Sequence, residues 1–167
     1  MVLHEPSAQW SVNAADWIRR VRSALGDLRP RVEHVGSNAV PGLVAKPTID
    51  LQVSVPDLDD EPSYRPALES LGVVLRAREP GHRYFRPDAG KPRVVHIHVC
   101  GQGSTWEHEH LLFRDFLRSH RAVATDYAEL KRRLAVEFRH DRLAYTDGKT
   151  EFVRQVVAMA RQEAESG

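Results

Sequence analysis

Apolar residues in the first third of the chain recur first at helical and then at strand spacing. Between residues 13 and 28 they return every three or four positions, which predicts an amphipathic helix that Ser11 or Asn13 could cap. Residues 31–35 and 48–55 instead alternate between apolar and polar positions, and a loop containing Pro and Gly separates them. The pattern therefore predicts a helix that packs on a sheet.

The middle of the chain is rich in strand patterns, and its last third is helical. From Ser104 onward the apolar period changes to three and four, and three apolar faces predict three closing helices. There is no internal repeat, and the stretch most like a linker, 56–66, is too short to separate two cores. We therefore expect one α+β domain over residues 1–167. The predicted elements of the middle are a short helix at 64–71, closed by Gly72, and strands at 73–77, 83–85 and 93–100.

Composition and charge exclude several classes of function. The 24 Lys and Arg residues nearly balance 23 Asp and Glu, so the chain lacks the broad basic field of a nucleic-acid binder. The single cysteine, Cys100, cannot form an internal disulfide, and no secretion signal is visible, which predicts a cytoplasmic protein. No segment approaches the ~18 consecutive apolar residues of a membrane span. We expect a small-molecule substrate and no nucleic-acid or membrane partner; the sequence does not reveal the oligomeric state.

The first candidate site follows the predicted strand at 31–35. Gly36 lets the backbone approach a ligand closely, and Ser37 can offer its hydroxyl and amide to a phosphate. On the next strand, alternation places Asp50 and Gln52 on one face, which makes Asp50 a candidate metal ligand beside a phosphate cradle. A glycine–serine pair is also common in turns, and a strand aspartate can be a solvated edge residue. This segment alone supports either interpretation.

Two histidines repeat this pattern on a later strand. His96 and His98 alternate with valine and isoleucine, which puts both imidazoles on one face. Residues two apart in a strand are separated by about 7 Å, so both rings could reach one cation or one substrate group. The pair favours a functional site, provided that its strand pairs with the strand that carries Asp50. A half-exposed strand would show the same alternation.

The cationic candidates lie on the predicted helices. Arg114 and Arg118 are four residues apart, where like charges repel by about 0.2 to 0.5 kcal/mol, a cost that a bound phosphate would offset. Neighbouring acids could equally pair with them at the surface. Lys131 follows Tyr127 by four residues, and Lys149 follows another tyrosine at the same spacing. Each tyrosine taken singly is explained as a core residue with a snorkelling lysine, so these residues carry weight only as a set.

A larger set of motifs resembles one family. The opening signature of the GrpB family is similar to the runs VEHVGS at 32–37, VPGL at 40–43, AKP at 45–47 and ID at 49–50. Later motifs resemble that family in the same order, namely the strand at 96–98, the helix at 113–118, Tyr127 with Lys131, and Tyr145 with Lys149. The likeness spans residues 10–160.

This resemblance implies a fold more clearly than a reaction. The GrpB family is placed within the nucleotidyltransferase superfamily, which implies a nucleotidyltransferase-like α+β fold with a central mixed β-sheet, an N-terminal helix and about three C-terminal helices. In that superfamily a Gly-Ser pair holds the triphosphate, and carboxylates on two strands bind divalent metal. Here Gly36 and Ser37 match the pair, and Asp50 matches the first carboxylate.

The sequence departs from the superfamily pattern at the other carboxylates. Gln52 stands where the second carboxylate would be, and His96 or His98 stands where the third is expected. Losing up to two negative charges weakens a magnesium site, whereas imidazole suits manganese or zinc better. The expected cofactor is a divalent metal, Mg or Mn with Zn as an alternative, held by Asp50, Gln52, His96 and His98.

The leading hypothesis is an enzyme that transfers a nucleotidyl or related phosphate-containing group from a nucleoside triphosphate to a small molecule. Asp50 and one histidine would bind the metal, and His98 would act as the general base. The residues expected to hold phosphates, neutralise their charge or line the substrate site are Gly36, Ser37, Lys46, Arg114, Arg118, Tyr127, Lys131 and Lys149.

Two alternatives belong to other classes of function. A non-catalytic module could bind a nucleotide or a coenzyme A-like ligand, which the neutral Gln52 favours. A metal-dependent hydrolase built on His34, His96, His98 and Asp50 would instead carry zinc or nickel and need no nucleotide.

Overall fold

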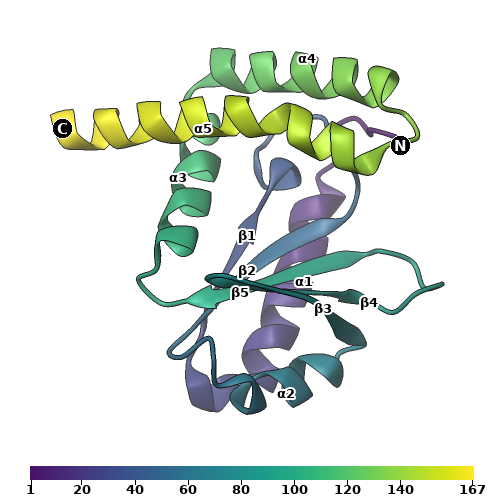
Figure 1. The fold of residues 1–167 in the computed structure, drawn as a ribbon, viewed down its shortest axis with the longest axis vertical. Helices are drawn as coiled ribbons and strands as arrows, with labels where there is room; N and C mark the ends of the chain where they lie inside the picture. Colours follow the sequence, from purple (N-terminus) through teal and green to yellow (C-terminus); the bar gives the residue numbers. More distant parts are fainter.

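The computed structural model describes residues 1–167 and places helices on both faces of one five-stranded sheet (Figure 1). The strands are β1 Arg31–Val35, β2 Ile49–Val55, β3 Val73–Glu79, β4 His82–Pro87 and β5 Val95–Gly101. The helices are α1 Gln9–Ala24, α2 Arg65–Glu69, α3 Thr105–Ser119, α4 Arg121–Glu137 and α5 Arg142–Ser166, with short 3-10 turns η1 Gly26–Leu28, η2 Ser37–Ala39 and η3 Glu61–Ser63. No helix has the combined length and hydrophobicity that a bilayer crossing requires.

The sheet has the strand order β1-β2-β5-β4-β3 and is mixed. β2 and β5 run parallel, and every other neighbouring pair is antiparallel. The parallel pairing sets Asp50 opposite His96, and Gln52 opposite His98. The predicted α+β class with a central mixed sheet is confirmed, and so is the pairing of the two strands that carry the candidate acid and histidines.

The strand bounds differ from the predicted ones where hairpin pairing extends them. β1 has the predicted bounds, whereas the strand predicted at 83–85 begins at His82 because it continues to the turn of the β3–β4 hairpin. Glu79 pairs with His82 across this turn, where Gly81 has a φ of 74°. Pairing with a neighbour, which a single segment does not display, decides where these strands end.

α1 starts earlier than the apolar period predicts, and its cap differs. The Ser7 hydroxyl accepts a hydrogen bond from the backbone N–H of Gln9 at 3.2 Å, whereas Ser11 and Asn13 lie inside the helix. The reason is Trp10, which is buried against the sheet and adds a turn to the apolar face. The predicted cap residues are therefore wrong.

Two apolar cores hold the layers together. The larger core lies between the sheet and α1 and α2, and consists of inward residues of the strands with the buried face of α1. The smaller core joins α3, α4 and α5 to the loop that follows η2. In Figure 1, α4 and α5 run across the top of the molecule, and α3 descends from them toward the sheet. The cavity described in the next subsection is lined by residues of the sheet and of these three helices.

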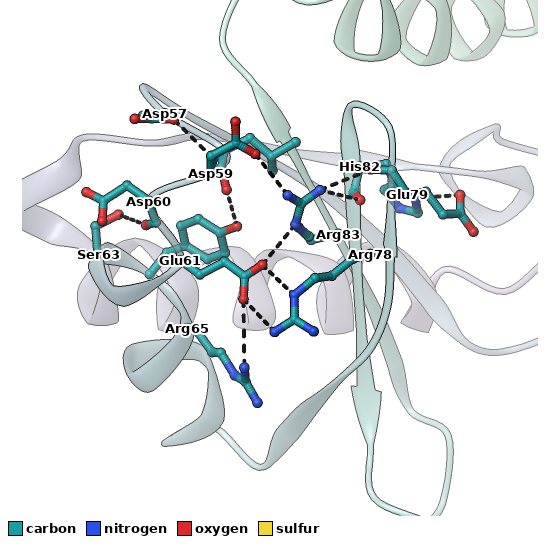
Figure 2. A network of polar contacts seen from close by, with 12 residues as sticks. Asp57, Asp59, Asp60, Glu61, Ser63, Arg65, Arg78, Glu79, His82 and Arg83 are labelled. Carbon is teal, nitrogen blue, oxygen red and sulfur yellow. Dashed lines mark hydrogen bonds and ion pairs between the residues drawn. The ribbon is translucent and has the colours of Figure 1, made fainter.

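A network of ion pairs fixes the β3–β4 hairpin to η3, as Figure 2 shows. Glu61 accepts two hydrogen bonds from Arg78, at 2.7 and 2.9 Å, and one from Arg83 at 3.0 Å. The hydrogen bond from Arg78, opposed by desolvation and reinforced by Arg83, lowers the pKa of Glu61 to about 2. The network holds the strand that begins with His82, which faces the cavity described next.

Candidate functional site

A cavity of ≈ 590 Å³ opens between the sheet and the C-terminal helices. This volume falls within the range of small-molecule sites. Its walls come from the β1–β2 segment, β2, β4, β5 and the three C-terminal helices. The predicted site residues that line it are Gly36, Ser37, Lys46, Asp50, His96, His98, Lys131 and Lys149.

Asp50 forms the acidic centre of this cavity. Its Oδ1 lies 3.1 Å from His98 Nε2 and 3.4 Å from His96 Nδ1. Burial by itself would raise the pKa of this carboxyl, but the hydrogen bonds from His96 and His98 outweigh it and hold the pKa well below its usual range. Strand pleating and the β2–β5 register explain why one carboxylate meets two imidazoles here.

The backbone at Gly36 passes close to the side chain of Asp50. Its φ of 79° and ψ of −176° lie in a region that essentially only glycine adopts. A Cβ at this position would lie 2.8 Å from Asp50 Oδ2. The glycine therefore lets the backbone pass directly beside the carboxylate, in addition to any role in holding a phosphate.

Replacement of this glycine tests the contact. Gly36→Ala is expected to lower the free energy of unfolding by about 1 to 3 kcal/mol, because it combines backbone strain with displacement of Asp50. The matched control is Gly90→Ala, which has a φ of 84° and no atom within 4 Å of the added Cβ. Urea unfolding should show the larger loss for Gly36→Ala, and equal losses would mean that the contact with Asp50 contributes nothing.

His82 extends the acid–histidine contact toward the surface. His82 Nε2 lies 2.9 Å from His98 Nδ1, and His82 Nδ1 lies 3.3 Å from Glu79 Oε2. Burial, followed by the charge of His98, lowers the pKa of His82 to about 4. Both ring nitrogens of His98 are therefore engaged, one by Asp50 and one by His82. A chain of polar contacts runs from Asp50 to the exposed carboxylate of Glu79.

Aromatic side chains cover one side of this chain of contacts. Trp106 stacks between His82, at a centroid distance of 4.6 Å, and His110, at 3.5 Å. Tyr84 packs nearly parallel to His98 at 5.3 Å. Sequence reasoning did not select His82, Trp106 or Tyr84. Single histidines and aromatic residues in a strand or at a helix start carry no distinguishing signal, and only alternation with a second polar residue would have suggested Tyr84.

Three lysines, Lys46, Lys131 and Lys149, make the lining of the cavity basic. The ammonium groups of Lys46 and Lys149 lie 4.8 and 4.5 Å from the ring centre of Tyr145, and Lys131 donates a hydrogen bond to the backbone oxygen of Val44. Burial is the main cause that lowers the pKa of Lys131 to about 7 and of Lys149 to about 8, and repulsion between the lysines adds to it. Such a group of partly desolvated cations suits an anionic ligand.

The structure does not bring Gln52 to the cavity. Although it shares a strand face with Asp50, the side chain of Gln52 is fully buried, and its Nε2 donates to the backbone oxygen of Glu107 at 3.4 Å. The first turn of α3 covers this part of the strand. Ser104 caps that turn by accepting a hydrogen bond from the backbone N–H of Glu107. The expected placement of Gln52 as a ligand in the cavity is wrong.

Both predicted helix arginines also lie outside the cavity. Arg114 is buried and donates to Glu33 Oε2 at 2.7 Å, and Arg118 donates to the backbone oxygen of Ala39 at 2.9 Å. They join α3 to the β1 and η2 segments. Arg118 borders a separate, smaller cavity of ≈ 300 Å³. The structure therefore does not bring these two predicted phosphate-binding arginines to the cavity, because that face of α3 packs against the β1 edge.

Tyr127 is a core residue rather than a cavity residue. It stacks on Phe152 at 5.0 Å and meets Phe113 edge to face at 5.4 Å. Burial raises the pKa of its hydroxyl. The alternative in which this tyrosine belongs to the core is the one observed, whereas Lys131 reaches the cavity from the same helix.

The donor atoms do not fit a resident metal ion. No group of three or more His, Cys, Asp or Glu side chains is arranged to hold one. His96 and His98 direct their nitrogens at the same oxygen of Asp50 instead of sharing a common empty point with it, and Gln52 points elsewhere. This arrangement uses the carboxylate as a hydrogen-bond acceptor for both histidines.

The mixed sheet with its helical layers is an α+β fold of the kind found in nucleotidyltransferases. Over 78% of this chain and 44% of the other, the structure has a TM-score of 0.54 and 13% sequence identity to the MgGTP-bound crystal structure of Cid1 poly(U) polymerase. At this identity the likeness concerns the fold.

The chain belongs to the GrpB family, whose sequence model, described as GrpB protein, matches residues 1–159. The UPF0157 protein SCO7215 of Streptomyces coelicolor is 39% identical over 158 residues, covering 95% of this chain and 83% of that protein. The crystal structure of conserved protein GrpB from Enterococcus faecalis has a TM-score of 0.87 and 29% identity, covering 98% of this chain and 99% of that chain. The family resemblance of the sequence motifs is confirmed.

Proposed function

We propose that this protein binds a nucleoside triphosphate in the cavity and transfers a nucleotidyl or related phosphate-containing group to a small hydroxyl compound. One observation carries the proposal: the Asp50 carboxylate lines the same cavity as Lys46, Lys131 and Lys149. Lys46 and Lys149 form no ion pair, and each has the ring of Tyr145 as its aromatic neighbour. A phosphate group would complete this basic lining.

The roles of the residues follow from their positions. The lysines and Ser37 bind the phosphates and stabilise the charge that develops during transfer. Asp50 accepts a hydrogen bond from the attacking hydroxyl through Oδ2, the oxygen that neither histidine occupies. As the hydroxyl oxygen attacks the phosphorus, the bond from phosphorus to the leaving group, pyrophosphate in nucleotidyl transfer, breaks. The hydroxyl proton passes transiently to Asp50 and then to solvent. A divalent cation would enter with the triphosphate as part of the substrate, since the protein offers it no preformed cluster.

A second candidate is a non-catalytic module that binds the same kind of ligand. The burial of Gln52 favours it, because the strand that carries two carboxylates in active relatives of this fold class presents one carboxylate to the cavity here. The two candidates share a ligand and differ in turnover. The metal-dependent hydrolase, by contrast, needs a metal cluster that the side chains do not form.

Binding and turnover can be measured separately. Calorimetry with each of the four nucleoside triphosphates, with and without manganese, should show binding to the wild type. Lys149→Gln should weaken it by about ten- to a hundred-fold, since a charge-assisted hydrogen bond contributes about 1.5 to 3 kcal/mol. Lys91→Gln is the control, because Lys91 is exposed and lies outside the cavity. Mass spectrometry of products separates the enzyme from the module, and no triphosphate binding at all would contradict both.

A further inference from the structure

Three arginines stand next to residues that line the cavity, one on β4, one just before β5 and one at the start of α5. Arg86 lies two residues after Tyr84 on β4, and therefore on the same face as this cavity-lining residue. Arg93 precedes β5, and its backbone oxygen accepts a hydrogen bond at 2.7 Å from Thr48, another lining residue. Arg142 begins α5, one turn before the tyrosine of that helix that lines the cavity. We call Arg86, Arg93 and Arg142 the arginine collar.

The collar arginines differ from the arginines on the opposite face of the same hairpin. Arg78 and Arg83 share the carboxylate of Glu61, as Figure 2 shows. Arg86, Arg93 and Arg142, by contrast, form no ion pair. The hairpin thus neutralises its arginines on one face and leaves the positive charge beside the cavity unbalanced.

The collar is electrostatically continuous with the lysines inside. The pKa of Arg93 is held below its ordinary value first by desolvation and then by repulsion from Arg86 and Arg142. The pKa of Lys46 is lowered by burial, then by Arg142 and Arg93, against the opposing effect of Asp50. Cations that repel one another beside a cavity favour a bound anion, which removes part of that repulsion.

We infer that the arginine collar is a second anion subsite, which takes a phosphate group that projects from the cavity while the lysines hold another. The inference rests on the proposed function and narrows its substrate class to compounds with phosphates at two places. Guanidinium groups match phosphate because they donate two parallel hydrogen bonds to it. The projecting phosphate is either the far end of a polyphosphate chain or a phosphate ester carried by the acceptor.

Inorganic phosphates of different length and one phosphate ester distinguish these sources. The full chain is titrated with pyrophosphate, linear tripolyphosphate, and glucose 6-phosphate in the presence of saturating pyrophosphate. The test variant is Arg93→Gln/Arg142→Gln, and the control is Arg133→Gln, an exposed arginine on α4 that lies outside the cavity. The double variant should retain pyrophosphate affinity within about threefold and lose about tenfold or more for the probe that reaches the collar. Loss with tripolyphosphate assigns a polyphosphate tail, and loss with glucose 6-phosphate assigns a phosphorylated acceptor.

The opposite outcomes are equally clear. Equal affinities of the wild type and the double variant for both longer probes would overturn the inference while leaving the proposed function in place. If pyrophosphate fails to bind the wild type, the proposed function fails. Whether the arginine collar binds phosphate is then tested by comparing the affinity of the wild type and the double variant for glucose 6-phosphate alone. A loss confined to a single-stranded oligonucleotide, with no change for the small phosphates, would overturn the inference and assign the collar to nucleic acid. Thermal unfolding of each variant checks that its fold is unchanged.

Discussion

Asp50→Asn is expected to lower turnover by at least about a hundredfold while nucleotide binding is kept, because a positioned general base contributes about 10²- to 10⁴-fold. Asparagine preserves the size of the side chain and removes the charge that both histidines approach. It also removes a negative charge from the cavity that would bind the triphosphate, so the affinity for a triphosphate should stay the same or increase. The measurement is product formation and calorimetric binding under the same conditions.

The control for this substitution is Asp147→Asn. Asp147 is exposed on α5 and lies outside the cavity, so removing its charge should change neither turnover nor binding. Equal turnover of Asp50→Asn and the wild type would contradict the assigned role of Asp50. If the wild type binds a triphosphate and forms no product with any acceptor, the binding module is the correct class.

Lys131→Met is expected to stabilise the fold at pH 6 to 7 by about 1 to 3 kcal/mol and to weaken triphosphate binding about tenfold or more. The side chain of Lys131 is 2% exposed, and burial is the main cause that lowers its pKa to about 7. Methionine fills a similar volume without a charge. The gain is reduced because the backbone oxygen of Val44 loses its hydrogen bond.

This stabilisation should depend on pH in a defined direction. Between pH 7 and about 10, Lys131 is neutral in the folded state and protonated in the unfolded state, so the free energy of unfolding of the wild type rises with pH. Lys131→Met lacks this contribution, and its advantage should be constant below pH 7 and shrink above it. The groups facing Lys131 are Lys149, Lys46 and Asp50, with Arg132 beside it. Because the pKa of Lys149 is also lowered, the free energy of unfolding of the variant should still rise with pH, but less steeply than that of the wild type.

Urea unfolding at pH 6, 7, 8 and 9 measures this difference. Lys91→Met serves as the control, since Lys91 is exposed and should give parallel curves for variant and wild type. The assignment of the lowered pKa to Lys131 would be contradicted if Lys131→Met were less stable than the wild type at pH 6 and its free energy of unfolding rose with pH as steeply as that of the wild type. The prediction separates stability from function, because the same buried cation that costs stability is the one expected to bind phosphate.

The acidic half of the candidate site could be predicted from the sequence to a useful extent. Alternation predicted that Asp50 lies on one face of its strand, and that His96 and His98 lie together on one face of theirs. The observed β2–β5 register puts these two faces on the same side of the sheet and brings Asp50 within hydrogen-bond reach of both histidines. The same alternation failed for Gln52. Alternation reports which face a residue takes, and α3 covers that face at Gln52 but leaves it open at Asp50.

The helical half of the site was less predictable. Lys131 and Lys149 lie at the cavity, whereas Arg114, Arg118 and Tyr127 are held by β1, by the η2 segment and by the second core. All five stand at regular helical positions opposite or beside apolar residues. Helical spacing fixes their relative directions, and the packing angle of each helix on the sheet selects which of them reaches the cavity.

By itself the sequence determined the α+β class, the order of the elements, the family, and the strand faces that carry Asp50 and the two histidines. Those properties follow from local periodicity and from residues that lie close together along one strand. Only the tertiary structure decided that β2 pairs with β5 and so brings Asp50 to the two histidines, that His82 joins His98 to the surface, and that Gln52 is covered. Such contacts depend on which elements cover each face of the sheet. Packing between residues that are distant in the chain determines which elements these are.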